Sequence, residues 1–313
     1  MTILPDKHTA EHTDRISKVA AGIRRRVLEH TLAHNGGYLS QACSSAEIFA
    51  ALYTSIMFLG RSEAPPVPLP FIGVPGIANP AGLTGAAYNG PTGANFDRFI
   101  MSPVHYALVL YATLVEVGRM SSEGLAQFNQ DGSTVEMIGA EHSPGHEVTA
   151  GSLGQALSQA GGIALARKLR ADTGRVFVFM SDGEFQSGQT WETLQALRFH
   201  KIDNLIAIVD VNQQQCDGAM KDVMAIEPLA DRIEAFGIAV ASVDGHDITA
   251  LSTAANRKPV GTPLVVLAYT DPCREIPLLK ERRPTLHYLR FKTAEEKMNY
   301  QSFLRQQIES GAW

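Results

Sequence analysis

The stretch RVFVFMSDGEFQSGQTWETLQALRFHKIDNLIAIVDVN at residues 175–212 decides the fold of this chain. Continuous apolar runs at 175–180 and 204–212 are typical of strands buried on both faces of a sheet. Between them, apolar residues recur along one side of a helix expected at 187–201. Strand–helix–strand order predicts parallel strands joined by a right-handed crossover.

The flanking sequence extends this pattern. Residues 238–243 and 263–270 are two more apolar runs of strand length. Periodicity predicts helices at 14–33, 103–118, 122–129 and 151–170, and capping-box spacing predicts two further helix starts, at Ser44–Glu47 and at Thr293–Glu296. We therefore expect an α/β fold, with a mostly parallel central sheet and helices on both faces, as a single domain over 1–313.

Two other features of the sequence concern its surface. Residues 61–95 hold seven prolines and many glycines with little periodicity, so a long loop is expected there, and loops of this length are usually functional or mobile. Arg24, Arg25 and Arg26 are consecutive within the first helix and spread around it, so they are expected mainly on a solvated face.

Composition and sequence pattern argue against several classes of protein. The net charge of −5 argues against nucleic acid or an anionic membrane as a partner. Residues 1–14 are polar, without the apolar core of a signal peptide, and no apolar run approaches a membrane span of about 20 residues. Cys43, Cys216 and Cys273 are widely spaced and are expected as small buried residues in a reducing compartment, so a cytoplasmic protein is predicted.

Polar residues follow the two strands of the opening stretch. Asp182 and Gly183 come directly after the first strand, and Asn212 ends the second. Ligands of parallel sheets bind beyond the carboxyl ends of the strands. Carboxylate and amide oxygens suit Mg²⁺ or Ca²⁺, which often complete their coordination with phosphate oxygens. The residues alone fit a divalent cation that bridges a diphosphate to the sheet edge. The alternative is an ordinary Asp-Gly turn and a strand-ending asparagine, and an isolated Asp-Gly would favour that alternative.

The segment from Ser181 to Gly218 also resembles the thiamine-diphosphate signature in the form that the transketolase family has. Four other segments are similar to motifs of that family: HNGGYLSQACSSAEIFAALY (34–53), DRFIMSPVHYALVLYA (97–112), PGHEVTAGSLGQALSQAGGIALARKL (144–169) and DGHD (244–247). The resemblance covers roughly residues 15–291 and is weakest in the 61–95 loop. It implies the first, diphosphate-binding domain of a transketolase.

The resemblance also implies roles for particular residues around the cofactor. Asp182 and Asn212 would hold the metal through side-chain oxygens, together with the backbone carbonyl of Gln214. Gly183 would lie against the diphosphate, and Glu184 of the same segment belongs to the implied cofactor-binding set. The others implied to contact the cofactor are His105, Gly151, Leu153 and His287.

Further residues are implied in substrate contact or assembly. His34 matches a histidine that contacts the sugar, and Glu192 matches an acidic residue at a subunit interface. Met137 or Ile138 stands where the family has another substrate histidine, so His142 or His146 is expected to reach that space instead. Other departures are Ser181 in place of a glycine, Ser187 in place of a glutamate, and SPVH in place of SKGH.

The family places its catalytic glutamate and its sugar-phosphate arginines in a second domain, and no such unit follows Trp313. We therefore expect a split enzyme, dependent on thiamine diphosphate and Mg²⁺ (Ca²⁺ being a possible substitute), with a C-terminal partner subunit, as α₂β₂. It would move a two-carbon ketol unit from a ketose to an aldehyde. The alternatives are the α subunit of a 2-oxo acid dehydrogenase, which should lack the 34–53 and 97–112 motifs, and a non-catalytic subunit that keeps the fold.

Overall fold

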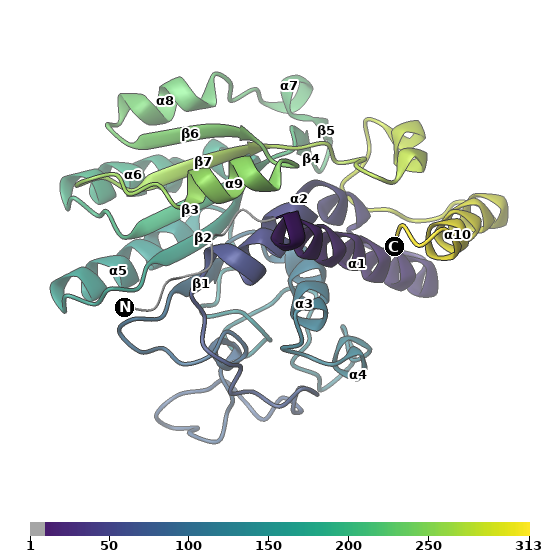
Figure 1. The fold of residues 1–313 in the computed structure, drawn as a ribbon, viewed down its shortest axis with the longest axis horizontal. Helices are drawn as coiled ribbons and strands as arrows, with labels where there is room; N and C mark the ends of the chain where they lie inside the picture. Colours follow the sequence, from purple (N-terminus) through teal and green to yellow (C-terminus); the bar gives the residue numbers. More distant parts are fainter. Residues whose placement is uncertain (1–9) are drawn as a thin grey trace.

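The structure, a computed structural model, describes residues 10–313; the first nine residues of the polar stretch, where no signal peptide is expected, lie outside the described residues. A parallel five-stranded sheet forms the centre (Figure 1). Its strands follow the order β1 (Arg98–Met101), β2 (Val176–Ser181), β3 (Leu205–Val211), β7 (Leu264–Tyr269) and β6 (Ala239–Asp244). The predicted α/β fold is confirmed. β1 was not predicted, because a four-residue strand that begins with arginine gives no apolar run.

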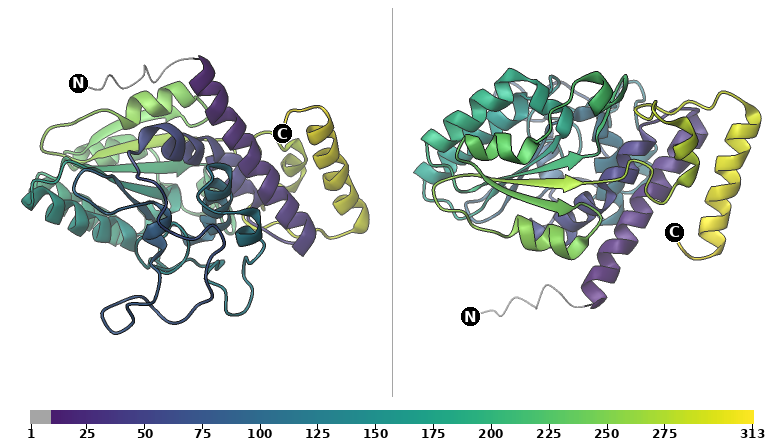
Figure 2. Two further views of the ribbon diagram at one scale, coloured as in Figure 1. Left: turned by 60° about the horizontal axis from the view of Figure 1, so that its bottom comes forward. Right: turned by 90° about the horizontal axis from the view of Figure 1, so that it is seen from above.

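Helices cover both faces of the sheet (Figure 2). Alternate strand residues face opposite layers, so Phe177 and Phe179 pack with one apolar cluster while Val176 and Val178 pack with the other. The first cluster includes α1 (Ala10–His34), α2 (Leu39–Ala51), α3 (Ala107–Glu116) and α9 (Ile248–Ala255). The second includes α5 (Gln155–Leu169), α6 (Gly188–Phe199) and α8 (Leu229–Ala235).

Two predictions about the first helices are wrong. Ser44 and Glu47 do not start a helix, because α2 begins at Leu39 and continues through them into a π-helical turn, Leu52–Ile56. Arg24 is not solvated: its side chain is 1% exposed and forms an ion pair with Glu47. In both cases the side chain binds a residue that is distant in the sequence. The local pattern had predicted Ser44 as a helix cap and Arg24 as a solvent-exposed residue.

The middle of the chain agrees with the sequence in outline. Between the π-helical turn and β1, the described chain is largely irregular, with the short 3₁₀ helix Gly85–Tyr88, and it projects from the β1 edge of the sheet (Figure 1). The helix expected at 122–129 is only the single turn α4 (Ser122–Leu125). The helix expected from 151 begins at Gln155, because Gly154 takes a left-handed φ of 85° and ends the preceding loop.

The remaining elements close the carboxyl end of the sheet. A small hairpin, β4 (Gln214–Gln215) and β5 (Gly218–Ala219), leads to α7 (Met220–Val223), and a 3₁₀ helix, Pro277–Arg282, follows β7. Helix α10 (Ala294–Glu309) packs on α1 and is capped by the Thr293 side chain, as predicted, while the Glu296 carboxylate accepts from the Lys292 amide. In the described part of the chain, no helix is long and apolar enough to cross a membrane.

Candidate cofactor site

A pocket of about 400 Å³ opens at the carboxyl ends of β2 and β3. The register pairs Ser181 with Asp210, so the chain leaves both strands at the same level. Asp182 and Asn212 follow directly and both line the pocket, as the sequence predicts. Its other lining residues are Ser40, Gln41, His105, Tyr106, Leu153, Ser181, Gly183, Gln186, Gln214, Gln215, Cys216, Asp217, Val223, Pro272 and His287.

Asp182 carries a buried carboxylate whose ionised form is disfavoured by its surroundings. Its Oδ2 accepts a hydrogen bond of 2.8 Å from the Gln213 amide, yet burial and the nearby Asp210 carboxylate raise its pKa to about 8. Among the described residues, neither Asp182 nor Asp210 forms an ion pair. A divalent cation at this point would stabilise the ionised carboxylate by direct coordination.

The hairpin that follows Asn212 completes a set of oxygens. Gln213 takes a left-handed φ of 58°, which turns the chain so that Gln214 and Gln215 line the pocket. The side-chain oxygens of Gln214 and Gln215 are both buried without a hydrogen-bond partner. Unpaired acceptor oxygens beside Asp182 and Asn212 fit a metal ion better than they fit an anion.

The glycine that the family has before Asp182 is not needed here. Ser181 has a φ of −104°, an extended conformation open to any residue, so the turn survives the Ser181 replacement. Gly183 lines the pocket, where an added methyl group would meet only the Gln215 side chain, at ordinary contact distance. The helix after β2 does not start beside Asp182, because a 3₁₀ turn (Asp182–Gln186) comes first and α6 begins at Gly188.

Two histidines form one wall of the pocket. The rings of His105 and His287 lie 5.0 Å apart, and Tyr38 contacts both of them. Burial, together with His287, lowers the pKa of His105 to about 3, and burial also lowers the pKa of His287. Both rings are therefore neutral at physiological pH and can act as hydrogen-bond donors or acceptors towards a ligand.

The loop before α5 reaches the opposite side of the pocket. Leu153 lines it and is 44% exposed, while Gly151 lies exposed beyond the lining. Glu184 is fully buried outside the lining: it accepts from the Gly154 and Ser181 amides at 2.9 and 2.8 Å and from the Ser102 hydroxyl. Glu184 is thus placed to hold this loop against β2 rather than to touch a cofactor.

The other predicted histidines lie away from the pocket. His34 is exposed at the end of α1 and stacks on His30. His142 binds Glu136 at 2.9 Å and lies against Phe71 of the long loop, in a separate cavity of about 170 Å³. His146 is 1% exposed and packs beside Tyr111. Neither His142 nor His146, the two histidines expected to reach the space of a substrate histidine, is among the residues that line the cofactor pocket.

Glu192 and the cysteines complete the account of the predicted residues. Glu192 is exposed on α6 and lines a shallow groove of about 330 Å³ shared with Gly161 and Gly162 of α5, remote from the pocket. Cys43 and Cys273 are buried as expected. Cys216 is exposed and lines the pocket, so the prediction that it is a buried residue is wrong.

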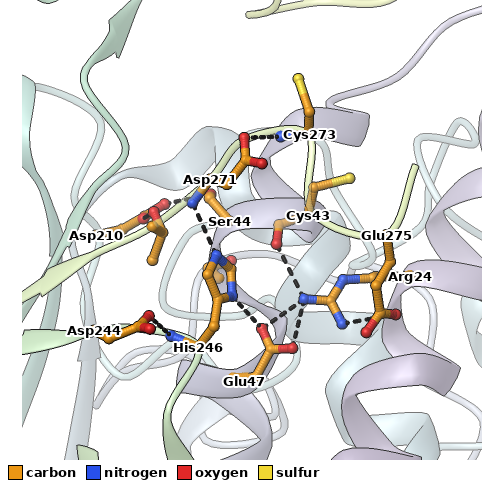
Figure 3. A network of polar contacts seen from close by, with 12 residues as sticks. Arg24, Cys43, Ser44, Glu47, Asp210, Asp244, His246, Asp271, Cys273 and Glu275 are labelled. Carbon is orange, nitrogen blue, oxygen red and sulfur yellow. Dashed lines mark hydrogen bonds and ion pairs between the residues drawn. The ribbon is translucent and has the colours of Figure 1, made fainter. Parts of the chain in front are cut away.

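A buried polar network reaches Asp271, next to Pro272 of the pocket lining (the network is shown in Figure 3). His246 donates from Nδ1 to Glu47 at 3.0 Å, and its Nε2 accepts from the Asp271 amide at 2.8 Å. Glu47 also binds Arg24, whose guanidinium reaches Glu275 at 3.2 Å. The network therefore joins α1, α2 and the segment after β7, which forms part of the pocket wall.

Breaking this network should destabilise the fold most at neutral pH. Burial alone would raise the pKa of Glu47, but the His246 hydrogen bond and the Arg24 guanidinium outweigh it and hold the pKa at about 2. The stabilisation is therefore complete above the unfolded pKa of about 4.5 and is lost as pH falls towards 2. Glu47→Gln should cost about 3–5 kcal/mol in urea unfolding at pH 7.5, and less at pH 3.5.

The matched control for that prediction is Glu29→Gln. Glu29 lies 3.9 Å from Arg25 with its side chain 45% exposed, so its loss should cost under about 1 kcal/mol at both pH values. Equal losses for Glu47→Gln and Glu29→Gln at pH 7.5 would show that the buried network contributes no more than a surface pair.

Sequence reasoning missed the polar core behind the pocket. Asp210 is fully buried and accepts hydrogen bonds from Ser44, Tyr106, Asn212 and Thr270. The available signal was the polar residue at a strand end two positions before Asn212. Its partners come from segments far apart in the chain, so the sequence could not reveal that they meet.

The fold and the pocket define an α/β protein whose candidate site lies at the carboxyl edge of a parallel sheet. Residues 84–267 match the family described as transketolase, thiamine diphosphate binding domain. The chain is 34% identical over 288 residues to a putative uncharacterised transketolase family protein of Sinorhizobium fredii, which covers 91% of this chain and 93% of that protein. The chain belongs to the transketolase family.

Two further similarities define the extent of the match. An apulose-4-phosphate transketolase subunit of Actinobacillus succinogenes is 29% identical over 278 residues, covering 88% of this chain and 91% of that relative. The transketolase of Campylobacter jejuni shares the fold at a TM-score of 0.67 and 22% identity, over 96% of this chain and 47% of that one. The chain thus spans about half the length of the solved transketolases that it matches, and about the full length of the Actinobacillus relative.

Proposed function

We propose that this chain is the cofactor-binding half of a split transketolase that depends on thiamine diphosphate and Mg²⁺. The observation that carries this proposal is the meeting of Asp182 and Asn212 in one pocket at the sheet edge of a transketolase-family chain. The reaction would move a two-carbon ketol unit from a ketose to an aldehyde. The family match favours this over a 2-oxo acid dehydrogenase subunit.

The metal would be held by oxygen atoms of three residues. Asp182 offers a carboxylate, Asn212 its amide oxygen, and Gln214 its backbone carbonyl at the start of the hairpin. This oxygen set suits Mg²⁺ and also accepts Ca²⁺. Gly183 leaves open space on the same side of the pocket, where a diphosphate could approach the backbone.

When bound, thiamine diphosphate would supply carbanion chemistry for the transfer of the two-carbon unit. The residues of this chain would orient the cofactor and would donate or accept protons near it. His105 and His287 are neutral, so each can donate one ring N–H and accept at the other nitrogen. Leu153 supplies an apolar contact at the pocket mouth, and Gly151 lies beyond it. His34 is proposed to contact the sugar from the end of α1, on the side that a partner would cover.

A second chain is required by this proposal. The relative of similar length is named as a subunit, and the solved transketolases are about twice as long as this chain. We propose a C-terminal type of partner that supplies the pyrimidine-binding and C-terminal domains, in a cytoplasmic α₂β₂ assembly. The open groove beside Glu192, with Gly161 and Gly162, allows close approach of another helix and is proposed as a contact between the chains of the assembly.

The substrate is proposed to be a specialised ketose or acceptor. The departures at Met137 and Ile138, and the positions of His142 and His146 outside the pocket, remove one expected contact to the sugar. The Actinobacillus relative is named for apulose 4-phosphate, which is consistent with a substrate outside the central pentose phosphates.

The test is transfer activity with both chains present. This chain and its partner, with thiamine diphosphate and Mg²⁺, should transfer a two-carbon unit between ketose phosphates and aldehydes, and either chain alone should stay at background. Transfer should be faster with a specialised ketose donor or aldehyde acceptor than with the pair xylulose 5-phosphate and ribose 5-phosphate. Release of CO₂ from a 2-oxo acid would instead support the dehydrogenase alternative, and full activity on the pentose phosphates would contradict the proposed specialisation.

A further inference from the structure

The Asp210 carboxylate lies directly behind the proposed metal site. It is fully buried at the end of β3. Its Oδ2 accepts hydrogen bonds from Ser44 Oγ at 2.6 Å, Tyr106 Oη at 2.8 Å and Asn212 Nδ2 at 2.9 Å. Its Oδ1 accepts from Thr270 Oγ1 at 2.5 Å. Four hydrogen bonds, three of them from other segments of the chain and one from Asn212 two residues further along, fix this carboxylate in one orientation (part of this core is visible in Figure 3).

The contact to Asn212 decides which way its amide points. Asn212 Nδ2 donates both to Asp210 and to Tyr106 Oη, the latter at 2.9 Å. Asn212 Oδ1 is left on the hairpin side, where it accepts from the Gln214 amide at 2.9 Å. The reversed amide would set an oxygen against the Asp210 carboxylate at the same separation, an unfavourable contact between two acceptors.

We propose that Asp210 is a positioning residue that keeps the Asn212 side-chain oxygen turned towards the cation and its diphosphate. This inference rests on the proposed function, because it assigns a role around the same metal site. Partners of metal ligands often set ligand orientation in this way, and their removal typically costs about 10–100-fold in metal affinity. The competing role for Asp210 is purely structural, as a tie between α2, β3 and the end of β7.

The two oxygens of Asp210 allow these roles to be separated. Asp210→Ala removes the acceptor that orients Asn212 and should raise the Mg²⁺ concentration for half-maximal thiamine diphosphate binding by about 10-fold or more. Thr270→Val is the matched control, because it removes a hydrogen bond to Oδ1 and leaves Oδ2 with Asn212. Its Mg²⁺ requirement should stay well below the rise of about 10-fold expected for Asp210→Ala.

An exchange of the two side chains tests orientation without changing charge. Asn212→Asp alone sets two carboxylates against each other and should weaken Mg²⁺-dependent binding. Adding Asp210→Asn restores a donor–acceptor pair in the reverse sense, because the new amide can donate to the new carboxylate. The hydroxyls of Tyr106 and Ser44 can turn to accept from that amide, and Ser44 can then donate to the Gln41 carbonyl instead. The double variant should therefore recover most of the binding lost in Asn212→Asp.

The measurement is a Mg²⁺ titration of thiamine diphosphate binding by calorimetry, on each variant copurified with the partner chain, beside its melting temperature without cofactor. The positioning role would be overturned if Asp210→Ala had the same Mg²⁺ requirement as Thr270→Val. It would also be overturned if the exchanged double variant bound the cofactor no better than Asn212→Asp does. If Asp210→Ala fails to fold, the exchanged pair still decides. Wild-type complex that binds no cofactor in a metal-dependent way would instead contradict the proposed function itself.

Discussion

Replacing Asp182 by asparagine is expected to abolish metal-dependent binding of thiamine diphosphate. Asp182 is 2% exposed and is the one carboxylate among the three proposed metal ligands. Asparagine keeps its size and its hydrogen bond from Gln213, so the change removes charge rather than packing. Binding at saturating Mg²⁺ should weaken at least about 100-fold, the upper end of what loss of an outer partner costs.

The control for Asp182→Asn is Asp203→Asn. Asp203 pairs with Lys168 at 2.7 Å on the surface, so its loss should leave cofactor binding unchanged. Calorimetric titration of thiamine diphosphate into each complex, with Mg²⁺ and with a chelator, gives the comparison. If Asp182→Asn binds the cofactor like the wild type, the metal does not lie at this end of β2.

His105→Gln should lower kcat by about 100-fold while the melting temperature stays within about 2 °C. The imidazole lines the pocket and contacts the rings of Tyr38, Tyr106 and His287, so glutamine keeps a polar end but loses the ring that handles protons. Steady-state kinetics of the assembled enzyme would report kcat and KM separately, and thermal unfolding would report stability.

The matched control is His12→Gln, near the other end of α1 from the pocket, which should leave kcat unchanged. A large fall in melting temperature for His105→Gln, with kcat per folded enzyme retained, would make His105 a packing residue of the pocket wall. A change confined to KM would place it in substrate binding alone.

The elements that could be predicted are those whose local sequence pattern agrees with the burial of their side chains in the fold. β2 and β3 are continuous apolar runs because both faces of those strands are covered. The predicted helix start at Ser44 was wrong because the Ser44 hydroxyl binds Asp210, 166 residues away, instead of capping a helix. The predicted exposure of Arg24 was wrong for the same reason, because Glu47 and Glu275 pair with its charge inside the protein.

The candidate site divides in the same way. Asp182 and Asn212 were predictable because parallel strands end at one edge, so residues thirty positions apart meet there. The orientation of Asn212 was not, because it depends on Tyr106 and Asp210, which meet only in the folded chain. The sequence also left His142 and His146 open as substrate residues, and packing against Phe71 and Tyr111 sets both away from the pocket.

Native mass spectrometry of this chain, coexpressed with the product of its neighbouring reading frame in the presence of thiamine diphosphate and Mg²⁺, tests the central claim most directly. The split-transketolase account predicts an α₂β₂ mass that carries two cofactors and loses them when Mg²⁺ is chelated. A homo-oligomer that ignores the neighbouring product and carries no cofactor would contradict it, and would favour a non-catalytic subunit that has kept the fold.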